Sequence, residues 1–544
     1  MHTLLDSPFF TVFKVHRIGL KMHRAAALLC DAWQQFYLHY PALLYACALL
    51  LGVAWAKHPT PILILPSIAL ALPLLHTSRQ KQALIRLLLA TVTMLAAFLW
   101  VNVYYKKTAL GDQELKGTAH LDISSLALVS TPFGSNWNYR GTIRTFVHQD
   151  ENSESHKLHN LPYWMSISQN KKLSRPPANV SYLVEGRLKE SQPGKYIFIP
   201  SKEAPWRPIR ASWSAAEVRY HLKSGIKRYL ATHIPDARSA AFLTGLSTGD
   251  FDDRQMQFEF SRFGLQHIMA ISGFHFAILA AIISQFLALI FSKKWSTCLL
   301  IFLMSSYFLF LGNSPSILRA WVMILLVLAG FLLERRTTGL NALGIALMVV
   351  LLLDPLAVLN MGFQFSFATT AAILLFYGPI ELFLQRIFTK RALSEVIEMD
   401  RVDKHGYLAI TFIRQALALA GAVNLVALPM TLFFFNKFPL FALLYNLFFP
   451  FLVSISMLLL LIAAALGLVI PSLGLAIHAF NSSYTSYVLN FAYELPINWD
   501  RNLRVSEISF EEIVGYLTLL FCAGIVTQYA LKQRQETLKD FQFL

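Results

Sequence analysis

The stretch from residue 267 to residue 283, HIMAISGFHFAILAAII, decides the fold. It is an apolar run with two histidines and a serine near its start, and runs of about 17–25 apolar residues can cross the roughly 30 Å core of a bilayer. Similar runs recur along the 544 residues, of which 55% are hydrophobic and 14% charged. Soluble proteins carry roughly a quarter charged residues. The sequence therefore predicts a polytopic α-helical membrane protein.

The apolar segments fall into two groups. Those of the first group precede a polar stretch from Lys106 to about Arg238, and those of the second follow it. We expect about 10–12 transmembrane or re-entrant helices. Prolines and glycines break several segments, and such breaks occur at membrane depth only where protein or a water-filled cavity covers the freed backbone groups. This pattern favours a channel or transporter over an anchor. The segments are 41–56, 61–76, 82–104, 263–292, 297–312, 316–333, 339–360, 363–378, 408–434, 440–468, 472–493 and 509–531.

The loop charges predict the orientation in the membrane. Basic residues at 79–86, 293–294, 335–336, 386–414 and 532–534 all fall on one side if the chain crosses at each segment. Cytoplasmic loops retain Lys and Arg, so that side is expected to be the cytoplasm, with both termini. The polar stretch then faces the periplasm or the cell exterior.

The polar stretch contains several segments with β-strand character. They read TAHLDISSLALV, YRGTIRTFVH, SYLVEGRL and KYIFIP, and they predict a small antiparallel barrel, for which the OB-fold is one option. Between Lys106 and Arg238 there are 20 Lys+Arg and 11 Asp+Glu, a net charge of +9 by subtraction. Basic side chains beside aromatic platforms suit binding of single-stranded nucleic acid, although the aromatic residues could equally form an ordinary core. The candidate DNA-binding residues are Trp137, Arg140, Arg144, Lys171, Lys172, Arg187, Lys189, Lys195, Trp206 and Arg207.

A second set of candidates is polar and lies in or beside the apolar segments. Polar groups in a bilayer usually face a bundle interior or a wet path. His267 and His275 are expected on roughly one face of a single helix. Each residue has a structural alternative: His267 could mark the water interface, Asp354 could cap a helix end, and Gln364 could bond a neighbouring helix. The candidate path residues are Asp250, His267, Ser272, His275, Arg319, Asp354 and Gln364.

The longest motifs resemble the ComEC family of competence proteins, bacterial membrane channels that admit transforming DNA. FGLQHIMAISGFH (263–275) is similar to the family's GLxHLLAISGLH pattern. NSPSILRAW (313–321), LDPLAVLNMGFQFSFATTAA (353–372) and the segment from VALPMTLFFFNKFPL to YNLFFP (426–450) resemble later family elements in the same order. The resemblance covers about residues 240–450 well.

The resemblance implies a bacterial inner-membrane channel that passes single-stranded DNA from the periplasm to the cytoplasm. It also implies partners: a periplasmic DNA receptor, a cytosolic ATPase motor, cytosolic single-strand-binding proteins and membrane lipid. The expected division is a cytoplasmic tail (1–40), membrane helices (41–105), the OB-like domain (106–213), an amphipathic helix at the membrane surface or a linker helix (214–238), the competence-type channel domain (239–531) and a cytoplasmic tail (532–544).

Other chemistries fit the sequence less well. An anionic-solute or lipid-precursor transporter, or flippase, is the first alternative, but no convincing inverted repeat supports it. An intramembrane serine hydrolase would use Ser272 with a histidine, yet His275 is only three residues away on the same segment. Many family members carry a metallo-β-lactamase-like nuclease domain whose HxHxDH motif is absent here. We therefore expect no enzymatic activity, no metal and no cofactor.

Overall fold

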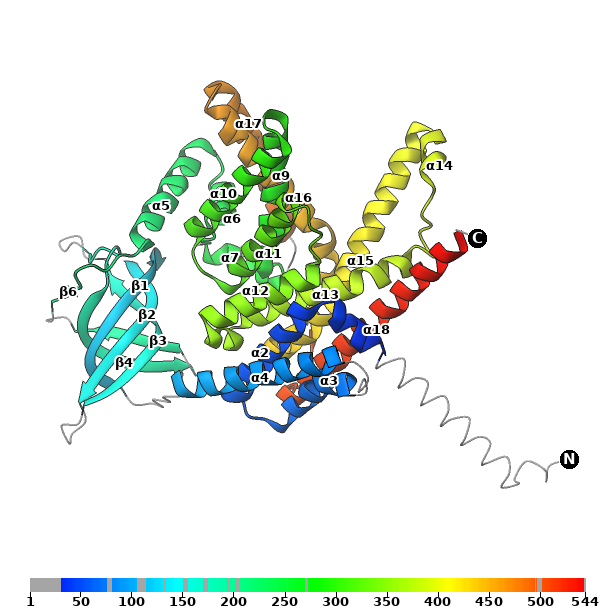
Figure 1. The fold of residues 1–544 in the computed structure, drawn as a ribbon. Coiled ribbons are helices and arrows are strands. Elements are labelled where there is room, and N and C mark those ends of the chain that lie inside the picture. The colour runs from blue at the N-terminus through cyan, green and yellow to red at the C-terminus, as the bar shows by residue number, and fades with distance from the viewer. Residues whose placement is uncertain are drawn as a thin grey trace. The chain divides into compact units, whose positions relative to one another are not determined.

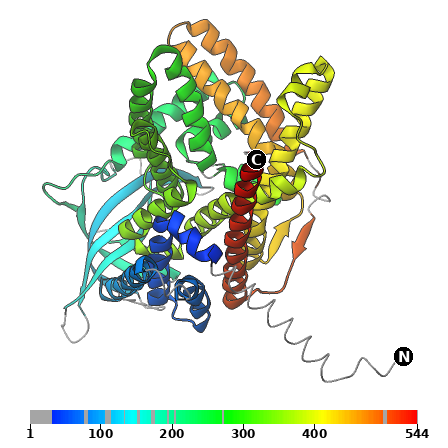
Figure 2. The ribbon, with the colours of Figure 1, turned by 45° about the vertical axis from the view of Figure 1, so that its right-hand side comes forward.

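The computed structural model describes residues 31–75, 81–104, 114–131, 134–149, 155–169, 175–192, 195–201, 205–251, 253–269, 273–494, 496 and 501–542. Figures 1 and 2 draw the chain as a ribbon coloured from the N- to the C-terminus. The chain separates into two compact units. Unit 1 comprises Met1–Leu99, Val322–Phe448 and Arg501–Leu544, and unit 2 comprises Trp100–Trp321 and Phe449–Asp500. Three of the four divisions fall inside helices, and each unit is described by itself.

Unit 1 is helical. It contains α2 (Pro41–Lys57), η1 (Pro61–Leu63), α3 (Ile64–Leu75), α12 (Gly339–Leu353), η2 (Pro355–Leu359), α13 (Met361–Leu384), α14 (Leu393–Glu398), α15 (Arg401–Phe435) and α18 (Phe510–Gln542), with most of α4 (Lys81–Tyr104). Helices α13 and α15 pack along one another, as do α2 and α12. The close packing of α2 requires Gly344, since a Cβ there would lie 2.5 Å from the backbone nitrogen of Leu43. Strands β7 (Lys437–Pro439) and β8 (Asn502–Arg504) pair antiparallel beside the start of α18 (Figure 2).

Unit 2 joins a β-barrel to a helical bundle. Its helices are α5 (Ala216–His233), α6 (Ala237–Thr248), α7 (Arg254–Arg262), α8 (Gln266–Met269), α9 (Gly273–Ile290), α10 (Lys293–Leu311) and α17 (Pro471–Tyr493), with parts of α11 (Pro315–Leu332) and α16 (Ala442–Gly467). Its strands are β1 (Leu115–Thr131), β2 (Gly134–Gln149), β3 (Ser155–Ser168), β4 (Tyr182–Gln192), β5 (Lys195–Pro200) and β6 (Arg207–Pro208).

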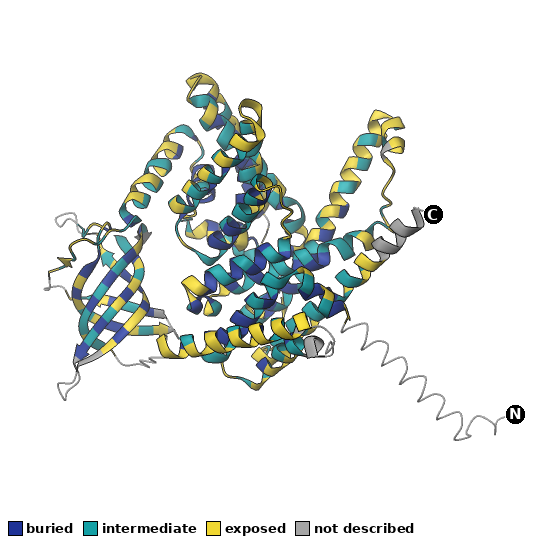
Figure 3. Cartoon of the chain, in the orientation of Figure 1, coloured by how far each residue is buried: buried dark blue, intermediate teal, exposed yellow. Residues whose placement is uncertain are grey.

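The barrel closes because β1 pairs with both β2 and β4, in the order β1-β2-β3-β5-β4-β1. Buried and exposed residues alternate along the strands, as Figure 3 shows, because successive side chains point to opposite faces. The interior holds Tyr139, Ile143, Phe146, Leu121 and Phe198, all nearly inaccessible to solvent. This is the small antiparallel OB-like barrel that the sequence predicts. Strand β3 is not among the four segments that the sequence predicts as strands, because Asn160 and Pro162 interrupt its alternation of apolar and polar residues.

Eight helices in the described part of the chain are long and apolar enough to cross a membrane. They are α4 from Leu84, α9, α10, α11, α13, α15, α16 and α18 to Gln533. A ninth span is possible if the helical segment Asp31–His39 and α2, which meet at a 100° bend, are counted as one. Two shorter apolar helices, Pro61–Ala71 and Gly339–Leu353, complete the set. The predicted polytopic helical fold is confirmed, and the predicted segment at 472–493 forms α17 without meeting the apolarity of a span.

Candidate functional site

A strip of outward-facing residues, three of them exposed, crosses the outer surface of the barrel. Arg140 of β2 lies opposite Trp164 of β3, and Trp164 lies opposite Ile197 of β5. Ile197 in turn lies opposite Lys189 of β4. Arg140 and Lys189 are exposed, and Trp164 keeps 37% of its surface accessible. The register therefore places a tryptophan between two cationic side chains on one outer face. We call these four residues the barrel strip.

Three predicted basic residues, one of them in the barrel strip, lie on the barrel surface in ion pairs. Arg144 contacts the carboxylate of Asp122, while Arg187 and Lys189 both approach Glu114, at 3.2 and 3.7 Å. Side chains in these pairs remain partly exposed, so water screens the interactions. The pairs hold the side chains against the strands without neutralising the whole face. Arg207 is exposed on β6, the side chain of Lys195 lies outside the described residues, and so do Lys171 and Lys172.

The other predicted aromatic residues serve mainly the barrel core. Trp206 packs between Tyr139 and Tyr182, with ring centroids 5.9 and 5.3 Å away. Trp137 is half-buried and contacts the edge of Tyr220. Burial raises the pKa of the Tyr139 phenol to about 12, and its hydroxyl donates to the Pro176 carbonyl at 2.8 Å. Trp164 is thus the member of the barrel strip that offers an open aromatic surface.

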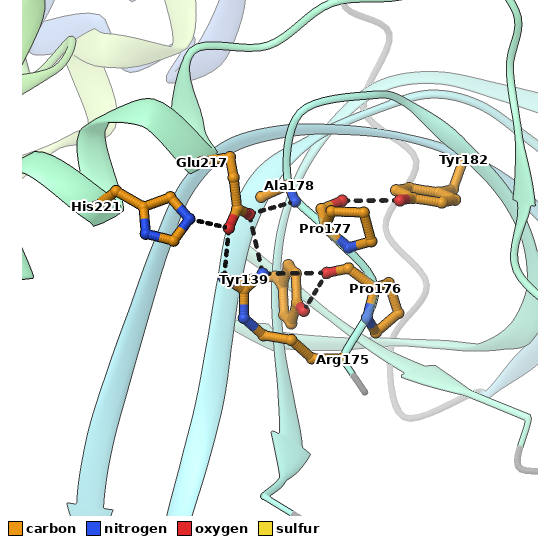
Figure 4. Close-up of polar contacts among 8 residues, drawn as sticks. All are labelled: Tyr139, Arg175, Pro176, Pro177, Ala178, Tyr182, Glu217 and His221. Carbon is orange, nitrogen blue, oxygen red and sulfur yellow. Dashed lines mark hydrogen bonds and ion pairs between the residues drawn. The ribbon is translucent and has the colours of Figure 1, made fainter. Parts of the chain in front are cut away.

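One ion pair fastens helix α5 to the barrel (Figure 4). The guanidinium of Arg175 donates to both carboxylate oxygens of Glu217, at 2.9 and 2.5 Å. Glu217 also accepts from the backbone N–H of Ala178 at 2.7 Å and lies 3.0 Å from His221. Arg175 lies over the ring of Trp137, 4.6 Å from its centroid. Hydrogen bonding from Arg175, and then from Ala178, lowers the pKa of Glu217. We call this group the α5 clamp.

The predicted path residues of unit 2 are only partly brought together. Residues 267 and 275 lie on separate helices, α8 and α9, so the expectation of a single helix face is wrong. His275 is 3% exposed, whereas His267 is exposed and lies 3.2 Å from the Gly264 carbonyl. Arg319, 7% exposed, packs against Gly273 so closely that a Cβ there would lie 2.8 Å from its Nη2 atom. Ser272 lies outside the described residues.

Asp250, Asp354 and Gln364 make local polar contacts. In unit 2, Asp250 accepts from the ammonium group of Lys223 on α5 at 3.1 Å. In unit 1, the Asp354 carboxylate accepts from the backbone N–H of Leu356 and so caps η2. Gln364 donates to the Val358 carbonyl at 2.9 Å. The last two residues therefore satisfy backbone groups freed at the break between α12 and α13.

A buried polar cluster in α17 escaped the sequence reasoning. His478, Asn481, Ser482 and Thr485 are all at most 3% exposed and share one face of the helix, since they are three or four residues apart. The Asn481 amide donates to the Ser456 carbonyl of α16, and the Thr485 and Ser456 hydroxyls are 3.1 Å apart. The spacing of these residues along an otherwise apolar segment was the available signal. The cluster joins α17 to the middle of α16.

Helix ends meet at the bend near Tyr40 in unit 1. The Asn341 side chain donates to the His39 carbonyl and accepts from the Ala42 backbone, at 3.0 and 3.2 Å. Arg86 donates to the Tyr37 carbonyl, and Lys532 lies 2.7 Å from His39 Nε2. The starts of α4 and α12 and the end of the α18 span therefore lie at one level. This is the grouping expected if the basic loops share one side of the membrane.

Comparisons with known proteins agree with this architecture. A family model described as Competence protein matches residues 248–533, more than half of the chain. "ComE operon protein 3" of Bacillus subtilis (strain 168) is 29% identical over 171 residues. That match covers 31% of this chain and 21% of the relative, so the aligned part spans about a fifth of the relative's length. No solved structure gives a significant match. With its multiple membrane-crossing helices and the family match over more than half its length, this chain belongs to the competence protein family.

Proposed function

We propose that this protein carries single-stranded DNA across the inner membrane, from the periplasm to the cytoplasm, during natural competence. The carrying observation is the barrel strip, in which Trp164 lies between Arg140 and Lys189 across neighbouring strands. A base can stack on an open aromatic ring while cationic side chains contact the phosphates on either side, and this mode needs no sequence preference. The face of strands 2 and 3 is also where OB-folds commonly hold oligonucleotides.

The membrane helices would then conduct the strand. A phosphate chain cannot enter hydrocarbon unaided, so the path needs polar walls. His275, Arg319 and Asp250 in unit 2 are the path residues that we propose, with His267 at the water interface. In unit 1, Asp354 and Gln364 would keep the break between α12 and α13 intact. A DNA receptor, a cytosolic motor and single-strand-binding proteins would act on either side.

The proposed orientation places the barrel outside and both termini in the cytoplasm. It rests on the positive loops and on the convergence of helix ends near Tyr40. At the opposite level of unit 1, β7 and β8 pair between the end of α15 and the start of α18. Along unit 1, helix ends near Tyr40 alternate with helix ends near β7 and β8, as expected if each helix crosses the membrane once. The domain limits expected from the sequence are kept in this proposal.

Binding to the barrel strip can be measured directly. The full-length protein in nanodiscs is titrated into a fluorescent oligothymidylate, and anisotropy gives the dissociation constant. Trp164→Ala is expected to weaken binding by roughly 5- to 150-fold, because a stacked base contributes about 1–3 kcal/mol. Arg140→Gln should lower the slope of log affinity against log salt by about 0.7. Trp213→Ala is the matched control, since Trp213 is 76% exposed but lies outside the strip.

Transport is tested in cells that lack the gene. Fluorescent DNA should stop in the periplasm of these cells, and the wild-type gene should restore DNA in the cytoplasm. Equal cytoplasmic entry in cells with and without the gene would contradict the proposal. Solute or lipid transport would then become the function to test.

A further inference from the structure

Helix α5 starts at the end of a membrane-spanning helix of unit 2. The Arg219 side chain reaches the turn that follows α10, where a Cβ on Gly312 would lie 3.0 Å from its Nη1 atom. Since α10 is a candidate span ending at Leu311, this contact marks one membrane surface. Arg219 also donates to the Ser124 carbonyl of β1 at 2.9 Å. The barrel, the start of α5 and the end of α10 therefore share one level.

The other end of α5 lies much deeper. The Asp236 backbone N–H, just after α5, donates to the Ser482 hydroxyl of α17 at 3.1 Å. The Ser239 hydroxyl donates to the Ser482 carbonyl, also at 3.1 Å. Neighbouring Asn481 contacts Ser456, which is close to the centre of the 26-residue helix α16, itself a candidate span. The turn between α5 and α6 is thus held beside the middle of α17, and the Tyr229 hydroxyl near the end of α5 lies 3.1 Å from His478 on the same helix.

Helix α6 then returns to the first level. The Tyr307 hydroxyl, one turn before the end of α10, donates to the Ser247 carbonyl at 3.4 Å. Asp250, just after α6, pairs with Lys223 on the second turn of α5. From Arg219 to His233 the helix rises about 21 Å, and half the bilayer core is about 15 Å thick. The length of α5 suits descent to the bilayer centre with some tilt. Figure 1 shows α5 and α6 as adjacent antiparallel helices.

Burial and charge separate this arrangement from a helix lying flat on the membrane. Helix α6 is largely enclosed, with Ser239, Phe242, Leu243 and Leu246 at most 1% exposed. A surface helix would instead leave its polar face open to water. Helix α5 carries Arg219, Lys223 and Lys227 four residues apart, so they form a stripe along one side. Charges at membrane depth need a partner, as Lys223 has in Asp250, or a wet path.

We infer that α5 and α6 form a re-entrant hairpin that enters the membrane from the barrel's side, and that the stripe of Arg219, Lys223 and Lys227 lines the path of nucleic-acid phosphates. The hairpin itself stands on the contacts above, whereas the identity of the anion rests on the proposed function. Its turn is tolerated at depth because Ser482 satisfies the backbone of Asp236 and Ser239 stabilises the same junction.

The stripe is tested by separating DNA capture from DNA entry. The double variant Lys223→Gln/Lys227→Gln is expected to lower cytoplasmic DNA by about tenfold while periplasmic DNA is unchanged. Lys223→Arg/Lys227→Arg keeps both charges and should restore entry. Arg228→Gln, which removes a neighbouring charge off the stripe, is the control, and membrane levels of each variant are measured. Normal entry in the double variant, or an equal loss with Arg228→Gln, would overturn the path assignment. Entry without the wild-type gene would instead defeat the proposed function.

The depth of the hairpin is tested without DNA. In the full-length protein with its native cysteines replaced by serine, one fluorophore is placed at Thr232 or at Trp213, both exposed positions. Nanodiscs carry Co²⁺ on chelating lipid headgroups in both leaflets, which quench only nearby fluorophores. Strong quenching at Trp213 and a loss of quenching at Thr232 are expected, since the bilayer centre is far from both surfaces. Quenching at Thr232 as strong as at Trp213 would show a surface helix and overturn the hairpin.

Discussion

The barrel and the contact between α16 and α17, which we call the α16–α17 seam, place their polar residues in opposite ways. The barrel keeps them near its surface, and the seam buries them. The barrel buries Tyr139, Phe146 and Phe198 and carries its ion pairs on or near the surface. Helix α17 buries Asn481 and Thr485 but leaves Phe480 and Tyr487 62% and 66% exposed. Water drives apolar groups inward in the barrel, whereas lipid gives them no such incentive, and hydrogen bonds then act between helices. A polar side chain therefore indicates a surface position in the barrel and a buried position in the α16–α17 seam, and an apolar side chain indicates the reverse.

The largest effect is expected at the α5 clamp. Arg175→Ala leaves the Glu217 carboxylate partly buried without its main partner, and breaking a fully buried pair costs roughly 3–5 kcal/mol. Both side chains are about 15% exposed, so a loss of about 2 kcal/mol is expected. Thermal unfolding of the purified protein, followed by tryptophan fluorescence, measures it. Arg187→Gln removes a much more exposed pair and should change the midpoint very little. Similar shifts for both variants would erase the distinction between clamp and surface pair.

An intermediate effect is expected on acidification. The pKa of Glu217 is lower in the folded protein than in the unfolded chain, so the unfolded chain binds the proton more readily. The stability that the clamp contributes is fully present above the ordinary glutamate pKa of about 4.3 and is lost as the pH falls through the folded value. The midpoint temperature of unfolding should therefore fall as the pH is lowered from neutral to below about 4.3. Glu217→Gln should reduce this dependence, and an unchanged acid profile in that variant would assign it to other carboxylates.

The smallest effect is expected in the seam. Thr485→Val removes the hydroxyl that contacts Ser456 and Asn481 while keeping the side-chain shape. Hydrogen bonds between membrane helices contribute about 0.6 kcal/mol on average. A double-mutant cycle with Ser456→Ala, read from unfolding midpoints in one detergent, isolates the coupling. A coupling larger than the Arg175 effect would mean that the seam, not the clamp, dominates the stability of unit 2.

The two regions also differ in how far the sequence predicts them. In the barrel, the alternation of apolar and polar residues indicates four strands directly, and the register then follows from burial of one face. Strand β3 is hidden because Pro162 and Asn160 break its alternation, although both residues occupy it. The aromatic content predicts binding platforms and core residues equally well, and only packing shows that Trp164 is open while Trp206 is enclosed.

In the membrane units, apolar length predicts the spans but not their interruptions. The 100° bend before α2 is bridged by hydrogen bonds of Asn341, which is distant in sequence from the residues it contacts. Likewise, the amphipathic pattern at 214–238 predicts a helix without indicating its depth, because Ser482 and Gly312 lie far along the chain. A contact between single polar groups that are far apart in the chain leaves no pattern in the local sequence. The sequence therefore does not predict such contacts.

The pairing between β3 and β5 is short, and this bears on whether a strand of another protein can pair with the barrel. Among the residues that the structure describes, these strands pair only at Tyr163 and Trp164, opposite Tyr196 and Ile197, and the first half of β3 has no partner there on its β5 side. An unpaired strand edge can recruit a strand from another chain. Pro162 lacks the N–H needed for such pairing, Asn160 has a left-handed backbone at φ 55°, and Lys157 adds a charge. The open half of β3 is therefore a poor template for pairing with a strand of another chain.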